Sequence, residues 1–256
     1  MTTLAIPRSD RRLLVGASSL IIGILLWEVY ARLAADPVFI PTVGDVSVAF
    51  LQLLAEPDFW SAYATTLEPF LIGWAAAIVL GVTLGLWMGR STIASGLSAP
   101  HLAFLNALPI STLVPVVVIV AGIDLLARSM VVFLFAIVEV VLTTASGVRY
   151  IDPDLFDMGR SFSLKWGKRL TRIILPGAAA GIAAAVRVGT GRAVVGMVVM
   201  ELLLVSVGVG KLISRYRDTF QAPRLYAVVL SLAIFALAVQ AVLRRLEQKA
   251  LIWRGD

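Results

Sequence analysis

Long runs without charged side chains are the feature that most restricts what this chain can fold into. Residues 69–89 and 225–243 contain no Asp, Glu, Lys or Arg, and residues 91–123 contain only His101 as a titratable group. Each run reaches the roughly 18 to 20 residues that cross a hydrocarbon core of about 30 Å. A backbone in lipid must satisfy its own hydrogen bonds, and runs of this length do so as helices. The sequence therefore predicts an all-α integral membrane protein.

The composition supports this prediction and argues against several other functions. Of the 256 residues, 59% are apolar and 15% are charged, whereas soluble domains carry about a quarter charged residues. The net charge of +6 is explained by basic residues at the cytoplasmic membrane surface, so we do not expect nucleic-acid binding. The chain has no cysteine and one histidine, so no metal site is expected. It also lacks the short motifs of hydrolases and metalloproteases, so we expect no catalytic residues and no enzyme.

The order of apolar and polar segments predicts about six transmembrane helices. They cover approximately residues 13–33, 67–89, 102–122, 130–148, 177–205 and 225–243, and Pro109 and Pro115 should break the third of them. The first could also be a secretory signal, but it is longer than such a segment and no cleavage pattern follows it. Between the first two spans, Pro57 is expected to break helical structure. Apolar residues from Val46 to Leu54 recur at helical spacing and predict an amphipathic surface helix. Gly81, Gly85 and Gly89 in the second span predict close helix packing.

Basic residues predict the orientation. They gather in residues 8–12, 149–172 and 244–254, and an even number of spans places all three clusters on one side, which should be the cytoplasm. Residues 1–12 and 251–256 are then cytoplasmic ends of a transmembrane domain at residues 13–250. The loop expected at residues 206–224 also holds basic residues and does not fit this pattern, whereas residues 36–68 contain none and support it.

The segment 149–176 carries the most specific pattern. It reads Asp-Met-Gly-Arg-Ser-Phe-Ser from Asp157 to Ser163 and ends as Ile-Ile-Leu-Pro from Ile173 to Pro176. This spacing resembles the cytoplasmic EAA loop of binding-protein-dependent ABC importer permeases, a Glu-Ala-Ala element followed by a glycine and then Ile-x-Leu-Pro. The last element is intact, but aspartate replaces the glutamate, Met-Gly replaces the alanines, and serine replaces the glycine. Residues 39–43, 105–123 and 187–202 resemble the nitrate, sulfonate and taurine branch of the same family.

The resemblance implies a transport subunit of the inner (cytoplasmic) membrane. Two ATPase subunits would bind ATP and magnesium, an extracytoplasmic binding protein would deliver a small anion such as a sulfonate, taurine or nitrate, and a second permease copy would complete the path. No cofactor is then expected in this chain. The loop would contain a cytoplasmic coupling helix between spans four and five. The residues implied in coupling are Asp157, Gly159, Ser163, Leu164, Trp166, Arg169, Leu170, Ile173, Leu175 and Pro176. If the family's glycine needs a positive φ, Ser163 carries a strain of about 1 kcal/mol or more.

Ionisable residues inside the predicted spans are candidates for the translocation path. They are Glu139, Arg187, Arg192 and Glu201. Charges at such depth cost at least about 2.5 kcal/mol, so they should face a cavity or pair with one another. The sequence alone allows Arg192 to pair with Glu201, or Glu139 with an arginine, as purely structural ion pairs.

The main alternative is an ion-coupled secondary transporter, which would need coupling carboxylates and internal repeats. Glu139 and Glu201 are the only candidate carboxylates, and no repeat is visible. Residues 208–212 faintly resemble a phosphate loop, but Leu212 replaces the required Ser or Thr. The sequence therefore favours an importer permease that binds no nucleotide itself.

Overall fold

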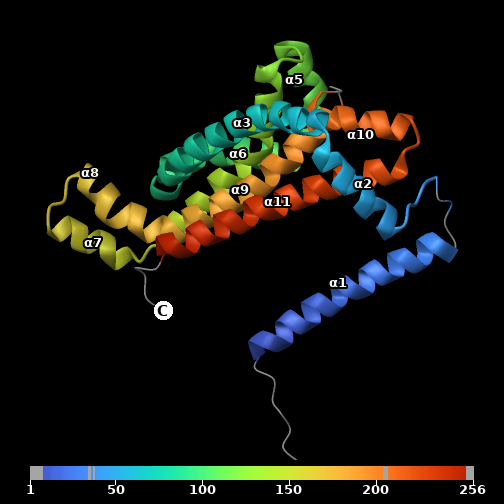
Figure 1. Ribbon diagram of the computed structural model, residues 1–256. Helices are drawn as coiled ribbons and strands as arrows, with labels where there is room; N and C mark the ends of the chain where they lie inside the picture. Colours follow the sequence, from blue (N-terminus) through green and yellow to red (C-terminus); the bar gives the residue numbers. More distant parts are fainter. Residues whose placement is uncertain (1–7, 34–35, 37, 204–206, 252–256) are drawn as a thin grey trace, which may run out of the picture. The chain divides into compact units, whose positions relative to one another are not determined.

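The computed structural model describes residues 8–33, 36, 38–203 and 207–251, and the regular elements in these residues are all helical. In chain order they are α1 (Arg8–Leu33), α2 (Val43–Ala55), α3 (Pro57–Arg90), α4 (Thr92–Ala107), the 3-10 turn η1 (Ile110–Leu113), α5 (Val114–Ala121), α6 (Leu125–Arg149), α7 (Pro153–Ser161), α8 (Trp166–Arg169), the π-helical turn η2 (Leu170–Ile174), α9 (Leu175–Leu203), α10 (Gly208–Asp218) and α11 (Ala222–Leu251) (Figure 1).

The helices divide between two compact units. One consists of Met1–Trp60 with Leu212–Ser231, and the other of Ser61–Lys211 with Leu232–Asp256. The larger unit contains α4 to α9 whole, together with most of α3 and α11. A single transmembrane domain over residues 13–250 stays a prediction.

Several described helices can cross a membrane. Four stretches are long and apolar enough: α3, α6, the continuous stretch Trp166–Leu203 through α8, η2 and α9, and α11 over Ala222–Gln248. A fifth candidate is α4 together with η1 and α5, two segments bent by 90° where they meet. The prediction of an all-α membrane protein is confirmed. The count of six spans is not confirmed, although α1, which covers the predicted first span, is 26 residues long.

Helices α3 and α6 run parallel, and this fixes the role of the bent pair between them. Gly73 of α3 lies against Val132 of α6, and Gly89 lies against Val148, so the residue numbers rise together along both helices. Two helices that cross a membrane in the same direction require the chain to return between them. Because α4, η1 and α5 are the helical segments of that connection, we infer that this bent pair crosses the membrane.

Glycines on α3 allow its close approach to α6. A Cβ atom at Gly81 would lie 2.7 Å from Cγ1 of Val140, and one at Gly85 would lie 2.8 Å from the carbonyl oxygen of Val141. A Cβ at Gly89 would meet a similar obstacle on α6. Such ridges of small residues let the backbones of membrane helices come together and gain van der Waals contact. The predicted packing role of these three glycines is confirmed.

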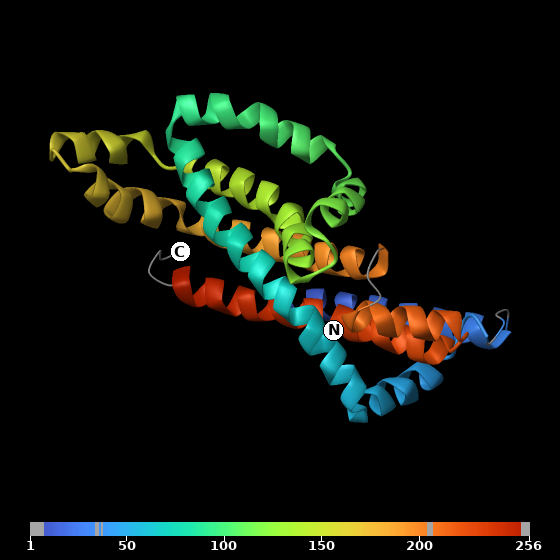
Figure 2. The same ribbon diagram turned by 90° about the horizontal axis from the view of Figure 1, so that it is seen from above.

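Glycines also bring α9 close to α6, on a different face. A Cβ at Gly147 of α6 would lie 2.7 Å from the Cα atom of Gly181 in α9. Further along, a Cβ at Gly196 would lie 2.9 Å from Cγ of Phe135. The numbers rise in opposite directions, so α6 and α9 are antiparallel. Helix α6 therefore packs against both α3 and α9 in the larger unit (Figures 1 and 2).

In the smaller unit, the N-terminus of α2 is capped from two sides. Oγ1 of Thr42 accepts a hydrogen bond from the N–H of Asp45, whose carboxylate accepts one from the N–H of Thr42. The N–H of Val43 donates to Oε2 of Glu28 on α1, at 2.8 Å. These bonds satisfy N–H groups that a helix start leaves unpaired. The helix predicted at residues 46–54 is thus confirmed, and its buried residues are Val46, Ala49 and Leu53.

The start of the second span was predicted too late. Helix α3 begins at Pro57 and not at Leu67, because a proline lacks an N–H but fits the first helical turn without loss. Pro69 lies inside the helix and leaves the carbonyl oxygen of Thr65 without its usual donor. NH1 of Arg128 donates to that oxygen at 3.2 Å, so the helix continues through Pro69.

The predicted third span, residues 102–122, is wrong in two details. Helix α4 already begins at Thr92, where the side chain of Ser91 accepts a hydrogen bond from the N–H of Ala94. Pro115 does not break the span, because it lies in the first turn of α5, where a proline fits without loss. The bend falls at Pro109.

We predict that Gly85→Ala lowers the stability of the purified protein by about 1 to 3 kcal/mol, because the added methyl group meets the α6 backbone. The matched control is Gly96→Ala, at a helical position with nothing within 4 Å of the new atom. This control should be neutral or stabilising. Thermal unfolding in detergent measures both, and equal effects of the two substitutions would contradict the packing described.

Candidate functional site

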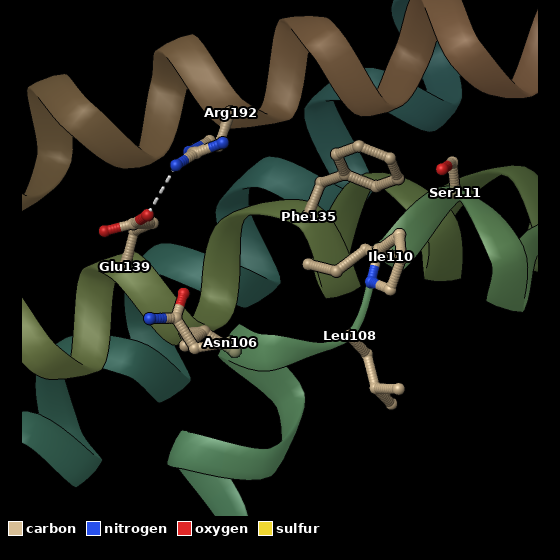
Figure 3. A pocket seen from close by; sticks show the side chains of 9 residues that line it. Asn106, Leu108, Ile110, Ser111, Phe135, Glu139 and Arg192 are labelled. Atoms are coloured by element: carbon tan, nitrogen blue, oxygen red, sulfur yellow. Dashed lines mark hydrogen bonds and ion pairs between the residues drawn. The ribbon is translucent and has the colours of Figure 1, made fainter.

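Two of the predicted path residues meet in a pocket of the larger unit. NH2 of Arg192, on α9, lies 2.8 Å from Oε1 of Glu139, on α6. Figure 3 shows the two side chains pointing toward one another across the gap between their helices. The pocket has a volume of about 210 Å³. Its remaining lining residues are Asn106, Leu108, Pro109, Ile110, Ser111, Phe135 and Val138.

Other parts of this chain do not fully bury the ion pair. The side chain of Glu139 is 25% exposed and that of Arg192 is 56% exposed. A charge inside the bilayer costs at least about 2.5 kcal/mol, and pairing offsets only part of that cost. Because lipid tails cannot solvate a guanidinium group, the exposed side of Arg192 needs water or another protein surface beside it. Of the pairings that the sequence allowed, the structure shows Glu139 with Arg192.

The bent pair supplies one wall of this pocket. Helix α4 ends at Ala107 and η1 starts at Ile110, so the backbone at Leu108 and Pro109 is extended. Non-helical backbone at membrane depth is tolerated where it is buried in protein or lines a cavity. Here the extended residues line the pocket, which explains how the membrane tolerates the break.

Arg187 lies outside this pocket. Its NH1 atom is 3.2 Å from Oε2 of Glu247, and its carbonyl oxygen accepts a hydrogen bond from Nε2 of Gln240 at 3.2 Å. Both partners belong to α11, so these contacts tie α9 to α11. A role for Arg187 in the path stays a prediction. Glu247 was not predicted, although it is the one acidic residue among the basic residues 244–249.

Glu201 caps the start of α10 and does not join the pocket. The residue is 5% exposed. Its Oε2 atom accepts a hydrogen bond from the N–H of Gly210 at 2.9 Å, and its Oε1 atom accepts one from Oγ1 of Thr66 at 2.6 Å. The same Thr66 hydroxyl accepts from the N–H of Val209 at 2.9 Å. Glu201 and Thr66 together therefore satisfy the free N–H groups at this helix start.

Helix α10 itself was predicted as a loop. Its buried residues Val209, Leu212, Ile213 and Tyr216 recur at helical spacing, a signal that was present in the sequence. Gly208 has a φ of 58°, and a Cβ there would collide with Thr66 and Glu201. The faint likeness of residues 208–212 to a phosphate loop thus reflects a helix start that a carboxylate already occupies.

The loop at 149–176 folds into a hairpin of α7 and α8, which projects from one end of the larger unit (Figures 1 and 2). Between the helices, the N–H of Leu164 donates to the carbonyl oxygen of Gly159, and the N–H of Ser163 donates to that of Arg160. This pair of bonds is the Schellman motif, which needs a left-handed residue and usually has glycine there. Ser163 has a φ of 50°, so the strain expected at this serine is present.

The exposed apolar residues of the hairpin differ from those expected. Trp166 is exposed, as a coupling residue should be. Leu155, Met158 and Phe162 are exposed as well. They were missed, although they are spaced three and four residues apart and so share one helix face. Leu164 is half-buried, with its Cδ1 atom close to Gly159.

Other predicted coupling residues stabilise the base of the hairpin. Leu170 packs with the cluster formed by Val148, Ile151, Ile174 and Ala178. Ile173 is buried against Gly159, where a Cβ would lie 2.7 Å from its Cδ1 atom. The remaining predicted coupling residues differ in their surroundings. Asp157 forms an exposed ion pair with Arg160, and Leu175 is 38% exposed. Nε of Arg169 is buried and has no hydrogen-bond partner among the described residues.

Pro176 lies in the first turn of α9, but no break separates α9 from the helical turns before it. The helical stretch runs on from Trp166 to Leu203. Immediately before the proline, the N–H of Leu175 donates to the carbonyl oxygen of Leu170 in a π-helical turn. Such turns absorb local irregularity inside α-helices, and here one precedes a residue that cannot donate a backbone hydrogen bond.

Comparison with known proteins identifies similar membrane permeases. Residues 77–252 match the family described as "Binding-protein-dependent transport system inner membrane component". The putative aliphatic sulfonates transport permease protein of Bacillus subtilis (strain 168) is 27% identical over 91% of this chain and 85% of its own length. The taurine transport system permease protein of Escherichia coli (strain K12) is 23% identical over 96% of this chain and 92% of its own length. The formylaminopyrimidine transport permease protein of Halalkalibacterium halodurans is 24% identical over 90% of this chain and 92% of its own length.

We predict that Ser163→Gly stabilises the chain, because glycine adopts the left-handed conformation without the cost of about 1 kcal/mol that serine carries. The melting temperature should rise by about 2 to 4 °C. Ser161→Gly is the matched control, since Ser161 is also exposed but ends α7 in a helical conformation, where glycine is unfavourable. A lower melting temperature for Ser163→Gly would show that the turn is not strained.

Proposed function

The chain belongs to the family of binding-protein-dependent transport system inner membrane components, and we propose that it carries a small anion as the permease of an ATP-driven importer. The match covers more than half of the chain, and the similar proteins are permeases. The observation that carries the proposal of an anion is the partly exposed Arg192 in the pocket at the bent pair.

An anion suits this pocket because it can compete with Glu139 for the guanidinium group of Arg192. Arginine binds carboxylate and sulfonate-like oxygens through a planar set of donors and cannot lose its charge. Asn106 and Ser111 add neutral polar groups beside the pair (Figure 3). The relatives named for sulfonates and taurine agree with such a substrate, whereas the relative named for formylaminopyrimidine carries a different class of solute.

A second copy of the chain completes the path in this proposal. The exposed side of Arg192 lies on a helix that is long and apolar enough to cross the membrane. Facing lipid would leave the charge unsolvated, whereas a second permease opposite it would enclose a water-filled route. We therefore propose a homodimer with the pockets of the two copies along the shared path.

The α7–α8 hairpin is the proposed docking site for the ATPase subunits, one on each copy. It projects from the larger unit and exposes Trp166, Phe162 and Met158. Exposed aromatic and methionine side chains are enriched at protein interfaces. ATP and magnesium would bind in those partners, on the cytoplasmic side with both termini, and the binding protein would dock on the opposite side.

We predict that Arg192→Gln greatly reduces uptake of an anionic substrate, because the pocket then holds an unpaired carboxylate and no cation. The measurement is ATP-dependent uptake into vesicles that contain the permease, its ATPase and its binding protein. Arg187→Gln is the matched control, since Arg187 lies on the same helix but contacts α11, and it should retain more uptake. Normal uptake by an assembled Arg192→Gln complex would contradict the proposed path.

We also predict that Phe162→Ala with Trp166→Ala weakens co-purification of the ATPase by at least about 30-fold, since a buried interface aromatic contributes about 2 kcal/mol or more. Lys165→Ala with Lys168→Ala is the control, because charges at an interface rim contribute little to affinity. Wild-type association of the aromatic double variant would exclude the hairpin as the docking site.

A further inference from the structure

A second pocket of the larger unit lies where α3 and α6 end, and no part of the proposed transport path uses it. Its volume is about 490 Å³. Two arginines line it, Arg90 from the last turn of α3 and Arg149 from the last turn of α6. The other polar lining residues are Ser91, Thr92 and Ser95.

Neither arginine has an acidic partner among the residues that the structure describes. NH2 of Arg149 donates a hydrogen bond to Oγ of Ser95 at 2.8 Å. The guanidinium group of Arg90 lies over the ring of Phe156, 4.3 Å from its centroid. Two cations therefore line one pocket without a negative charge beside them, which favours an anionic ligand.

The pocket lies at the level of lipid headgroups. Because α3 and α6 are parallel, their last turns reach the same face of the membrane. Trp87 lies three residues before Arg90, and Tyr150 directly follows Arg149. They are 53% and 88% exposed, respectively. Tryptophan and tyrosine gather at the boundary between hydrocarbon and water. The two arginines are thus placed where the phosphates of a bilayer are found.

Apolar side chains lie next to the polar ones on the same connection. Ile93 and Leu97 of α4 are 73% and 63% exposed, respectively. They alternate in sequence with the pocket residues Thr92 and Ser95. A ligand with a phosphate and long acyl chains matches this combination of exposed apolar residues and unpaired cations better than a free anion does.

We propose that this pocket binds the headgroup of an anionic phospholipid, with Arg90 and Arg149 on its phosphate. Basic pockets between transmembrane helices are known to bind such headgroups. The acyl chains run along Ile93 and Leu97. A lipid bound here lies beside Phe156 of α7, and so at the base of the hairpin proposed to dock the ATPase.

Native mass spectrometry of the full-length chain tests this proposal. The delipidated protein is incubated with equal amounts of phosphatidylglycerol and phosphatidylcholine that have the same acyl chains, and the retained lipids are counted. The wild type should prefer phosphatidylglycerol by roughly thirtyfold, the effect of two basic residues at an anionic surface. Arg90→Gln with Arg149→Gln should abolish the preference, whereas Arg90→Lys with Arg149→Lys should keep most of it.

The matched control is Lys165→Gln with Lys168→Gln, which removes the same charge from exposed positions of the hairpin and should leave the preference intact. An unchanged preference in the arginine-to-glutamine double variant would overturn the proposal. Displacement of phosphatidylglycerol by millimolar inorganic phosphate would overturn it as well, because it would assign the pocket to a free anion. Should the glutamine variant fail to fold, loss of the preference in the lysine variant would also contradict it.

Discussion

Close packing of α6 against α3 and α9 is the constraint on which the rest of the larger unit depends. Glycines on α3 and α9 let the three backbones approach to distances that any side chain would prevent. In lipid there is no hydrophobic driving force between helices, so such contacts supply much of the association energy. This packing fixes the rotation of α6 and α9, and with it the position of Glu139 opposite Arg192.

The ion pair lies beside the break in the bent pair. A charge pair inside the bilayer needs a polar neighbourhood, and the extended residues at the break before Pro109 line a pocket beside it. Because the parallel course of α3 and α6 requires a crossing between them, that break falls within a segment that spans the membrane. The proposed solute path rests on the bent pair, the cavity and the exposed face of Arg192.

The sequence predicted the helices well because lipid forces an apolar run to satisfy its own hydrogen bonds. It could not choose the partner of Arg192, because spacing does not determine how neighbouring helices are rotated. The late start assigned to α3 arose from treating Pro57 as a breaker, although proline also begins helices. Ser163 was recognised as a strained position from the motif alone, and its φ of 50° agrees. Phe162 was missed because only the family motif, and not the helix face beside it, guided the choice.

Thiol accessibility tests most directly whether the pocket at the bent pair is part of a water-filled path. The chain has no cysteine, so single substitutions can be labelled without background. Asn106→Cys and Ser111→Cys, in the assembled transporter, should react with a membrane-impermeant thiol reagent at rates that change when ATP is added. Leu80→Cys, at an exposed apolar position of α3, should stay unreactive. Failure of both pocket cysteines to react under every nucleotide condition would contradict the account.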